Sequence, residues 1–242
     1  MNTDTNPYES DKLLAEYLLF HFGQQEEVLP WAFGPQAALS FPVRTVAHFS
    51  EGKVASALDL GCAVGRSSFE LSKSAEQVVG IDFSNSFVEA ASKLNKGESI
   101  TYEVAEEATL TRTLHANASD RGDGEVHFEQ GDATNLRTDL GSFDRVHAAN
   151  LLCRLPNPNL LLQRLPELVK PGGELVLATP CTWLEEYTAK EFFPKQSTLE
   201  WLQDSLSAHF DLANQADEPF LIREHARKYQ WTVSMLTRWV RK

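Results

Sequence analysis

The sequence is poor in cysteine and in positive charge, and it contains no long hydrophobic run. Its three cysteines, Cys62, Cys153 and Cys181, lie far apart with no CxxC spacing, which excludes a disulfide framework and a cysteine zinc site and suits a reducing compartment. No apolar stretch reaches the roughly 18 residues of a membrane-spanning helix. The beginning of the chain also lacks the basic and apolar segments of a signal peptide. We therefore expect a cytoplasmic protein with no metal site and no membrane association.

Acidic residues outnumber basic ones along the chain. The 34 Asp and Glu residues against 22 Lys and Arg give a formal net charge of −12, which repels a polyanion such as nucleic acid. We therefore expect a small-molecule substrate and no nucleic-acid partner. The 242 residues, 42% of them hydrophobic, are enough for one α/β domain with a buried core.

Apolar runs and helical spacings alternate along the chain. Strands are expected at 54–60, 77–82, 99–104, 126–132, 143–150, 174–180, 219–223 and 229–240. Helices are expected at 8–22, 36–49, 65–74, 84–95, 159–169 and 198–208. Such alternation predicts a doubly wound, mostly parallel sheet, and the last two strands predict an antiparallel pair at one edge. We expect a single domain over residues 1–242, with 1–50 as a helical cover and 51–242 as the core.

A glycine turn in "ALDLGCAVGRSSFEL" (57–71) follows the first expected strand and opens a helix. A Walker loop is excluded, because Arg66 follows the last glycine and the spacing is too short. A dinucleotide loop lacks its GxGxxG pattern. The remaining pattern is D-x-G-x-x-x-G, formed by Asp59, Gly61 and Gly65, and it resembles motif I of the class I S-adenosylmethionine methyltransferases.

Further motifs of that family follow in the right order over residues 55–178. "VVGIDFS" ends in Asp82 for the ribose hydroxyls and Phe83 for the adenine face. "EQGDATNL" offers Asp132 for the adenine amino group, with Ala133 beside it. "FDRVHAANLL" and "LVKPGGELVL" match the fourth strand and the turn before the fifth. Taken alone, each of these aspartates also fits a purely structural role, as a loop residue or a helix N-cap.

The resemblance implies an α/β class I methyltransferase (Rossmann-like) fold with a seven-stranded sheet, an N-terminal helical cover and S-adenosyl-L-methionine as cofactor. It implies a cofactor site made of Tyr17, Asp59, Gly61, Cys62, Ala63, Gly65, Asp82, Phe83, Asp132, Ala133 and Asn150. Cys62 reads as a small loop residue rather than a nucleophile.

Four other segments carry aromatic and charged residues: "NPYESDKLLAEYLLFHFG", "NLLCRLPNP", "TPCTWLEEYTAKEFF" and "PFLIREHARKYQWTV". From Asn6 to about Trp239 they resemble the 5-thiohistidine N-methyltransferase that completes ovothiol biosynthesis. That resemblance implies methylation of the imidazole π-nitrogen of 5-thiohistidine to give ovothiol A. It also implies functional coupling to the sulfoxide synthase of the same pathway.

The residues of these segments suggest roles in binding the acceptor. The substrate-binding candidates are Tyr8, Phe22, Arg154, Glu185, Tyr187, Arg223 and Tyr229, and the catalytic candidates are Asn150, Tyr187 and His225. Arg154 or Arg223 suits the substrate carboxylate, and Glu185 or Glu186 suits its ammonium. Asn150 and Tyr187 are candidates for orienting the ring, and His225 for accepting a proton. His147, inside an apolar strand, reads as a hydrogen-bonded core histidine rather than a base.

Three other functions compete with this hypothesis. A methyltransferase for another small amine or imidazole would share every cofactor motif. A Rossmann-type oxidoreductase is disfavoured by the missing third glycine. A non-catalytic cofactor binder would not need the clustered polar and aromatic residues of the four acceptor segments.

Overall fold

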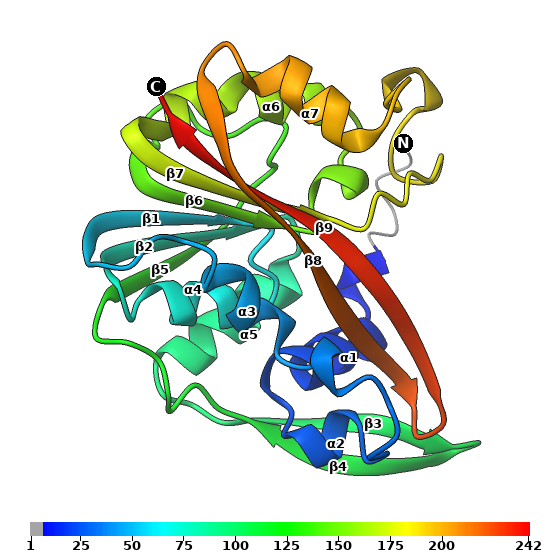
Figure 1. Ribbon diagram of the computed structural model, residues 1–242. Coiled ribbons are helices and arrows are strands. Elements are labelled where there is room, and N and C mark those ends of the chain that lie inside the picture. Colours follow the sequence, from blue (N-terminus) through cyan, green and yellow to red (C-terminus); the bar gives the residue numbers. More distant parts are fainter. Residues whose placement is uncertain (1–6) are drawn as a thin grey trace.

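A seven-stranded sheet forms the centre of the computed structural model, which describes residues 7–242 (Figure 1). Its strand order is β5-β2-β1-β6-β7-β9-β8. The strands are β1 (Val54–Leu60), β2 (Ala75–Asp82), β5 (Glu125–Gln130), β6 (Phe143–Ala149), β7 (Val169–Thr179), β8 (Phe210–His225) and β9 (Lys228–Arg241). The first five pair in parallel, whereas β9 runs antiparallel to both β7 and β8. The predicted fold and the antiparallel edge pair are confirmed.

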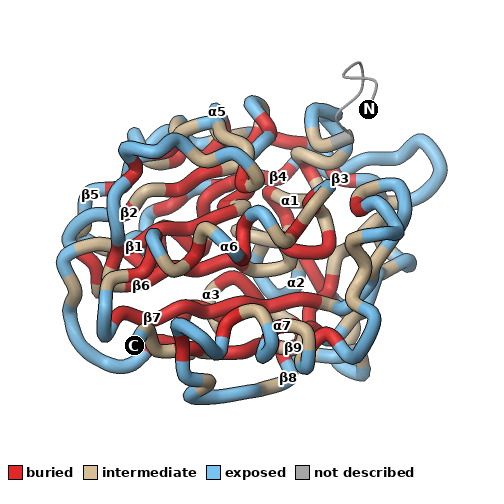
Figure 2. The backbone as a smooth tube through the Cα atoms, turned by 90° about the horizontal axis from the view of Figure 1, so that it is seen from above, coloured by how far each residue is buried: buried red, intermediate tan, exposed pale blue. Residues whose placement is uncertain are grey.

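Helices cover both faces of this sheet (Figure 1). The helical elements are η1 (Pro7–Glu9), α1 (Asp11–Phe22), α2 (Gln25–Val28), η2 (Gln36–Ala38), α3 (Phe41–Val46), α4 (Arg66–Leu71), α5 (Asn85–Asn95), η3 (Leu152–Arg154), α6 (Pro158–Leu168), η4 (Lys190–Phe192) and α7 (Thr198–Leu206). Helices α3, α4 and α5 lie on one face, and α6 and α7 lie on the other. The central strands are therefore buried on both sides, as Figure 2 shows for β1, β6 and β7, which explains their continuous apolar sequences.

Each face of the sheet has its own hydrophobic core. Leu58 and Leu60 of β1 point toward α6 and α7, where they join Leu161, Leu165 and Leu206. The neighbouring Ala57 points to the opposite face, where the core includes residues of α1, α4 and α5. This alternation follows from the two-residue period of a strand.

The N-terminal segment begins and ends its first helix as the sequence predicts. Ser10 caps α1 by accepting a hydrogen bond from the Leu13 amide, and the Gly23 amide donates to the Leu19 carbonyl at its end. The single helix expected over 36–49 is wrong, because Ser40 adopts a left-handed conformation with φ of 57° and separates η2 from α3.

Two hairpins extend beyond what the sequence indicates. One is the separate pair β3 (Ile100–Glu107) and β4 (Leu110–Ala116), of which only the first strand is expected from "SITYEV". The other is β8–β9, whose pairing runs on past the end of β7 to His225 and Lys228. The two hairpins meet near α2, where the Ala226 amide donates to the Glu106 carbonyl (Figure 1). Between residues 7 and 242, no helix has the length and apolarity to cross a bilayer.

Candidate active site

The order of the parallel strands reverses at β1, which lies between β2 and β6. In open α/β sheets, ligands bind in the crevice at such a point, outside the carboxyl ends of the strands. The glycine turn follows β1, Asp82 ends β2 and Asn150 follows β6 directly. The fold therefore places these three predicted elements at the same edge of the sheet.

The conformation of the glycine turn brings backbone atoms without side chains to this edge of the sheet. Gly61 and Gly65 have φ values of +69° and +92°, which favour glycine. The amides of Gly61 and Cys62 donate to the Ile81 carbonyl, tying the turn to β2. A Cβ atom at Gly65 would lie 2.7 Å from the ring of Phe128, so this position excludes larger residues. Cys62 is buried, and burial raises the pKa of its thiol, which agrees with a small loop residue rather than a nucleophile.

Asp82 joins the glycine turn to the segment that follows β2. Its Oδ2 accepts from the Ala63 amide at 2.8 Å, and its Oδ1 accepts from the Ser84 amide at 2.9 Å. Burial raises the pKa of this carboxyl to about 6, although the backbone hydrogen bonds oppose the rise. Each oxygen has a second lone pair for a ligand hydroxyl.

Asp59 faces the interior rather than the crevice. Its Oδ2 accepts from the Ser68 hydroxyl at 2.6 Å, its Oδ1 lies 2.8 Å from His147 Nδ1, and only 1% of the residue is exposed. His147 Nε2 in turn lies 3.0 Å from Thr45 Oγ1. Both carboxylate oxygens of Asp59 thus bind buried side chains, so the structure places this predicted cofactor residue as a support beneath the glycine turn. His147 is the hydrogen-bonded core histidine that the sequence predicts.

The remaining adenosine-side candidates lie after β2 and β5. Phe83 is 58% exposed, which leaves a ring face open at the edge of the sheet. Asp132 turns one oxygen, Oδ1, to the amide and hydroxyl of Thr134, at 2.8 and 2.7 Å. Ala133 is buried beside it. This arrangement fixes the Asp132 carboxylate while its second oxygen stays outside the turn.

Asn150 has a strained backbone at the end of β6. Its φ of 57° is left-handed, its amide donates to the Ala178 carbonyl, and its Oδ1 accepts from the Ser234 hydroxyl at 2.7 Å. Strained non-glycine residues concentrate at functional sites. The bond to Ser234 also orients the Asn150 amide with its nitrogen directed away from β9.

Four aromatic and charged side chains from three distant segments meet around Arg154, four residues after Asn150. The Arg154 guanidinium lies over the Tyr187 ring, 4.5 Å from its centroid. Tyr8 lies close enough to Arg154 and Tyr187 to interact electrostatically with both, and Tyr187 likewise interacts with the neighbouring Glu186. Burial raises the pKa of Tyr8 to about 12, so it remains protonated. We call Tyr8, Arg154, Glu186 and Tyr187 the acceptor cluster.

Tyr17 packs against this cluster from α1. Its ring centroid lies 6.1 Å from that of Tyr8 and 4.8 Å from that of Phe87. Burial also raises the pKa of the Tyr17 phenol, which keeps it neutral. Tyr17 therefore packs between Tyr8 of the acceptor cluster and Phe87 of α5.

Five predicted acceptor residues lie elsewhere. They are Phe22, Glu185, Arg223, His225 and Tyr229. Arg223 is buried in an ion pair with Glu106 at 2.7 Å. Its strand partner Tyr229 lies five residues, or about 17 Å along β9, from Ser234, which is the residue that binds Asn150. Because β8 and β9 extend past the sheet, their tip carries Arg223, His225 and Tyr229 away from Asn150.

These placements correct their predicted roles. The His225 Nδ1 accepts from the Arg227 amide within the hairpin turn, and the Tyr229 hydroxyl donates to the Ala226 carbonyl. The Glu185 side chain is 65% exposed and pairs with Lys190 at 3.1 Å. Phe22 packs on Phe69 beneath the end of α1 rather than on Arg154.

Glu9 is a residue of this region that sequence reasoning missed. Its carboxylate accepts from the amides of Asn85 and Ser86 at the start of α5, at 2.8 and 3.1 Å, and the Ser84 hydroxyl donates to the Tyr8 carbonyl. These contacts attach η1 to the segment that carries Asp82 and Phe83. A separation of 76 residues in sequence leaves no local signal for them.

Comparisons with known proteins agree with this geometry. A parallel sheet with a reversal at β1, a glycine turn and acids at the ends of β2 and β5 define a class I methyltransferase. Residues 52–235 match the family described as "Methyltransferase domain", and the chain belongs to this family.

S-adenosylmethionine is the methyl donor of this enzyme class, and the glycine turn, Asp82 and the exposed Phe83 ring suit it. Among residues 7–242, no three His, Cys, Asp or Glu side chains are grouped to hold a metal ion.

Similar proteins include O-methyltransferases of ubiquinone biosynthesis. A ubiquinone biosynthesis O-methyltransferase of Coxiella burnetii is 25% identical over 122 residues, which cover 50% of this chain and 42% of that protein. The protein of the same description from Xanthomonas axonopodis pv. citri is 30% identical over 154 residues, covering 61% and 54%. The chain thus spans about half the length of these curated relatives.

Solved structures agree on the fold. The N-methyltransferase NodS from Bradyrhizobium japonicum is 15% identical with a TM-score of 0.54, and the match covers 83% of this chain and 92% of that one. The YcgJ protein from Bacillus is 13% identical with a TM-score of 0.56, covering 84% and 98%.

Proposed function

We propose that this methyltransferase methylates the imidazole π-nitrogen of 5-thiohistidine to form ovothiol A. The observation that carries the proposal is the acceptor cluster, whose Arg154 lies four residues after Asn150. Tyr8, Arg154 and Tyr187 come from three of the four segments that resemble the 5-thiohistidine methyltransferase, and their side chains interact with one another. Residues that are distant in sequence thus converge where the acceptor must bind.

In this proposal the cofactor lies along the carboxyl ends of β1, β2 and β5. The glycine turn lies along the amino-acid chain of the cofactor. Asp82 accepts from the ribose hydroxyls, and Asp132 accepts from the adenine amino group. Phe83 and Tyr17 pack around the adenosine. Of the cover expected over residues 1–50, the described part, residues 7–50, forms the lid of a single domain, with η1 over this site, whereas residues 1–6 lie outside the described part of the chain.

The acceptor binds between the cofactor and the acceptor cluster. Arg154 binds the substrate carboxylate in two-point contact, and Glu186 binds the ammonium, a role left to it by the Glu185–Lys190 pair. Asn150 and Tyr187 orient the imidazole.

The bound cofactor supplies an electrophilic sulfonium methyl group. Transfer of this methyl group to the imidazole nitrogen would leave the electron pair of the S–CH₃ bond on the cofactor's sulfur. A neutral imidazole nitrogen needs little activation, so correct positioning supplies much of the rate. The proton on the other imidazole nitrogen leaves to solvent.

Methyl transfer followed by product mass tests the proposal. The protein is incubated with S-adenosylmethionine and either 5-thiohistidine or histidine. One added methyl group on 5-thiohistidine, with none on histidine, is the expected result. Methylation of both would indicate a broader imidazole methyltransferase. No transfer to 5-thiohistidine by protein that still binds the cofactor would refute the choice of acceptor.

The sulfoxide synthase of ovothiol biosynthesis is the functional partner that this proposal implies. Such coupling is tested by combining the two enzymes and following methylated product from the synthase's own substrates.

A small zwitterionic acceptor also agrees with the charged acceptor cluster, which an apolar quinone of the kind named for the curated relatives would leave unpaired.

A further inference from the structure

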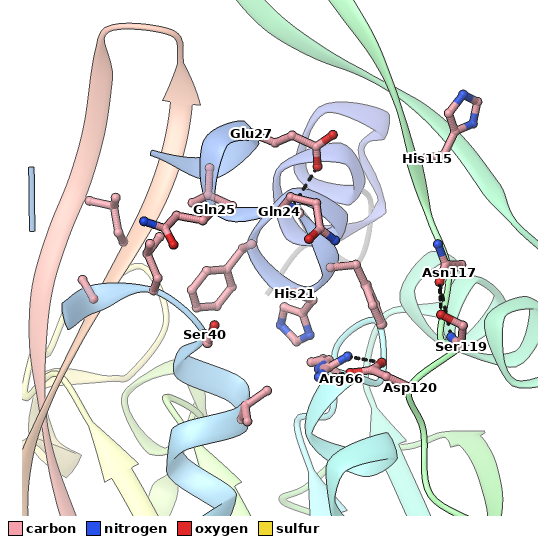
Figure 3. Close-up of a pocket in the computed structure, with 18 residues that line it drawn as sticks. His21, Gln24, Gln25, Glu27, Ser40, Arg66, His115, Asn117, Ser119 and Asp120 are labelled. Atoms are coloured by element: carbon pink, nitrogen blue, oxygen red, sulfur yellow. Dashed lines mark hydrogen bonds and ion pairs between the residues drawn. The ribbon is translucent and has the colours of Figure 1, made fainter. Parts of the chain in front are cut away.

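The mechanism proposed above leaves two features of the molecule unused. One is a cavity of about 680 Å³ at the end of α1 (Figure 3), where polar side chains already bind one another, as Arg66 and Asp120 do at 2.6 Å. The other is a pair of reduced cysteines, Cys153 and Cys181, next to the acceptor cluster. Thiols have a covalent reactivity that the lining of the cavity lacks.

The topology of the sheet brings these two cysteines to the same edge. Strands β6 and β7 are parallel neighbours, and Ala149 pairs with Ala178 at their carboxyl ends. Just past the sheet, the Asn150 amide donates to the Ala178 carbonyl and keeps the two segments together. Cys153 lies three residues after Asn150, and Cys181 lies three residues after Ala178. The segments that leave these adjacent strands therefore carry both thiols.

Thr179, the last residue of β7, contacts both cysteines. Its carbonyl accepts from the Cys181 thiol at 3.7 Å, and its hydroxyl oxygen accepts from the Cys181 amide at 3.2 Å. The Cys153 thiol interacts with the Thr179 side chain and lies close enough to Cys181 to interact with it electrostatically. The two sulfur atoms are thus neighbours around one residue, with no bond between them.

The two thiols differ in their access to reagents. Cys181 is exposed, whereas Cys153 is 0% exposed. Burial raises the pKa of the Cys153 thiol, and the nearby Arg154 opposes that rise. In thiol–disulfide exchange, an accessible thiol reacts first with a small disulfide, and a second thiol beside it then displaces the small thiol. Cys181 suits the first of these roles and Cys153 the second.

Cys153 also contacts the acceptor cluster. Arg154 Nη1 lies 3.7 Å from Cys153 Sγ and donates to the Cys153 carbonyl at 3.3 Å, and the same guanidinium lies over the Tyr187 ring. Tyr187 belongs to the segment that follows Cys181. A bond between the two sulfur atoms would draw Cys153 Sγ away from Arg154 and join the two segments that carry Arg154 and Tyr187.

We propose that Cys153 and Cys181 form a reversible disulfide at the edge of the acceptor cluster, made by exchange with a small-molecule disulfide. The Cys181 thiolate attacks one sulfur of that disulfide, so that a mixed disulfide forms and the first small thiol leaves. The Cys153 thiolate then attacks Cys181 Sγ, so that the Cys153–Cys181 bond forms and the second small thiol leaves. The two protein thiols are oxidised, and their two electrons and two protons pass to the two small thiols.

A dithiol reductant reverses both steps of this exchange. The inference goes beyond the proposed function, and it does not depend on the identity of the methyl acceptor.

Oxidised glutathione is the probe that tests this proposal. The reduced, folded chain is incubated with an excess of oxidised glutathione, and the released glutathione, the intact mass and the tryptic peptides are followed. Trypsin cuts after Arg154 and Arg164, so Cys153 and Cys181 fall on different peptides and a link between them is detected directly. The variants are Cys153→Ser, Cys153→Ala and Cys181→Ser, and Cys62→Ser at the buried third cysteine is the control.

We expect the unaltered chain and Cys62→Ser to release two molecules of glutathione per chain, to lose two hydrogens in mass and to give the linked peptides. Both Cys153 variants release one molecule and keep one glutathione on Cys181, and Cys181→Ser releases none. Cys153→Ala covers the case in which a buried hydroxyl unfolds the chain.

Three results would overturn the proposal. They are an unaltered chain that keeps glutathione on Cys181, a folded chain in which Cys181 does not react, and a linked peptide that contains Cys62. Because thiol exchange is measured without a methyl acceptor, its failure is distinct from failure of the proposed function.

Discussion

His147 Nδ1 lies 2.8 Å from Asp59 Oδ1, and only 1% of either residue is exposed. The pair joins β6 to β1 directly beneath the glycine turn, with Ser68 and Thr45 as outer partners. A carboxylate in such a place is stable only while its partners remain, because an unpaired buried charge is costly. His147 therefore holds the first acid of the glycine motif in position without facing the ligand.

Replacing His147 tests that role. We expect His147→Leu to lower the free energy of unfolding by about 3 kcal/mol or more, because it leaves Asp59 with Ser68 alone. Urea unfolding measures the change. His127→Leu is the control, since the His127 side chain is 69% exposed and its loss should change stability by less than about 0.5 kcal/mol. Equal effects of the two substitutions would contradict the prediction.

Gly65→Ala tests the close packing at the start of α4. The new Cβ would have both an unfavourable φ and a contact of 2.7 Å with Phe128. Gly141→Ala is a matched control, because Gly141 has a similar φ of +82° with nothing within 4 Å. We expect about 1–2 kcal/mol of destabilisation for Gly141→Ala from backbone strain. Gly65→Ala should lose about 1–3 kcal/mol more through overpacking. Indistinguishable unfolding midpoints would show that Phe128 moves aside freely.

The ionisation of Asp82 gives a pH dependence of stability. Burial raises its pKa to about 6, so the folded protein holds this proton where the unfolded chain has lost it. The contribution of Asp82 to the unfolding free energy therefore falls as pH rises from about 4 to 6, by about 3 kcal/mol in all. The difference in unfolding free energy between the unaltered chain and Asp82→Asn, followed by urea unfolding across this range, isolates the effect. A difference that stays constant with pH would contradict it.

Binding of the cofactor should have the opposite pH dependence. The ribose hydroxyls need an ionised acceptor, so the affinity for S-adenosylhomocysteine should increase as pH rises through about 6 and level off above 7. In Asp82→Asn the affinity should be lower and nearly independent of pH over this range. Calorimetric titration at several pH values measures both. An unaltered slope in the variant would show that another group titrates.

Arg154→Lys tests the acceptor cluster. Lysine keeps the charge but loses the flat contact with Tyr187 and the two-point grip on a carboxylate. We expect the KM for 5-thiohistidine to rise about tenfold or more, with the affinity for S-adenosylhomocysteine changed less than about twofold. Arg223→Lys is an instructive comparison, because Arg223 pairs with Glu106 far from Asn150 and should leave the KM unchanged. If Arg223→Lys raises the KM instead, the placement of the acceptor is wrong.

The sequence predicts the sheet well because its central strands are buried on both faces and read as continuous apolar runs. It also predicts which residues end β1, β2 and β6, since motif spacing determines the strand ends. Strand β4 was missed because its side chains are largely exposed, so no hydrophobic pattern marks it.

The acceptor residues are harder to predict from sequence. Arg223, His225 and Tyr229 lie on strands that continue past β7, and nothing local shows how far a hairpin extends. The inward orientation of Asp59 depends on His147, which is distant in sequence, and the motif alone does not reveal that partner. The contact of Tyr8 with Arg154 and Tyr187 arises only when three distant segments fold together.

The contacts of Glu9 have a consequence for the proposed lid. Ser84 caps the Phe87 amide of α5, whereas the Asn85 and Ser86 amides donate to Glu9 of η1. Lifting η1 therefore leaves these two amides to water and frees the Ser84 hydroxyl from the Tyr8 carbonyl. The same short segment carries Asp82, which holds the ribose in the proposed site. Movement of η1 away from this segment therefore breaks three hydrogen bonds together, so the proposed lid and the ribose-binding segment are held as one unit.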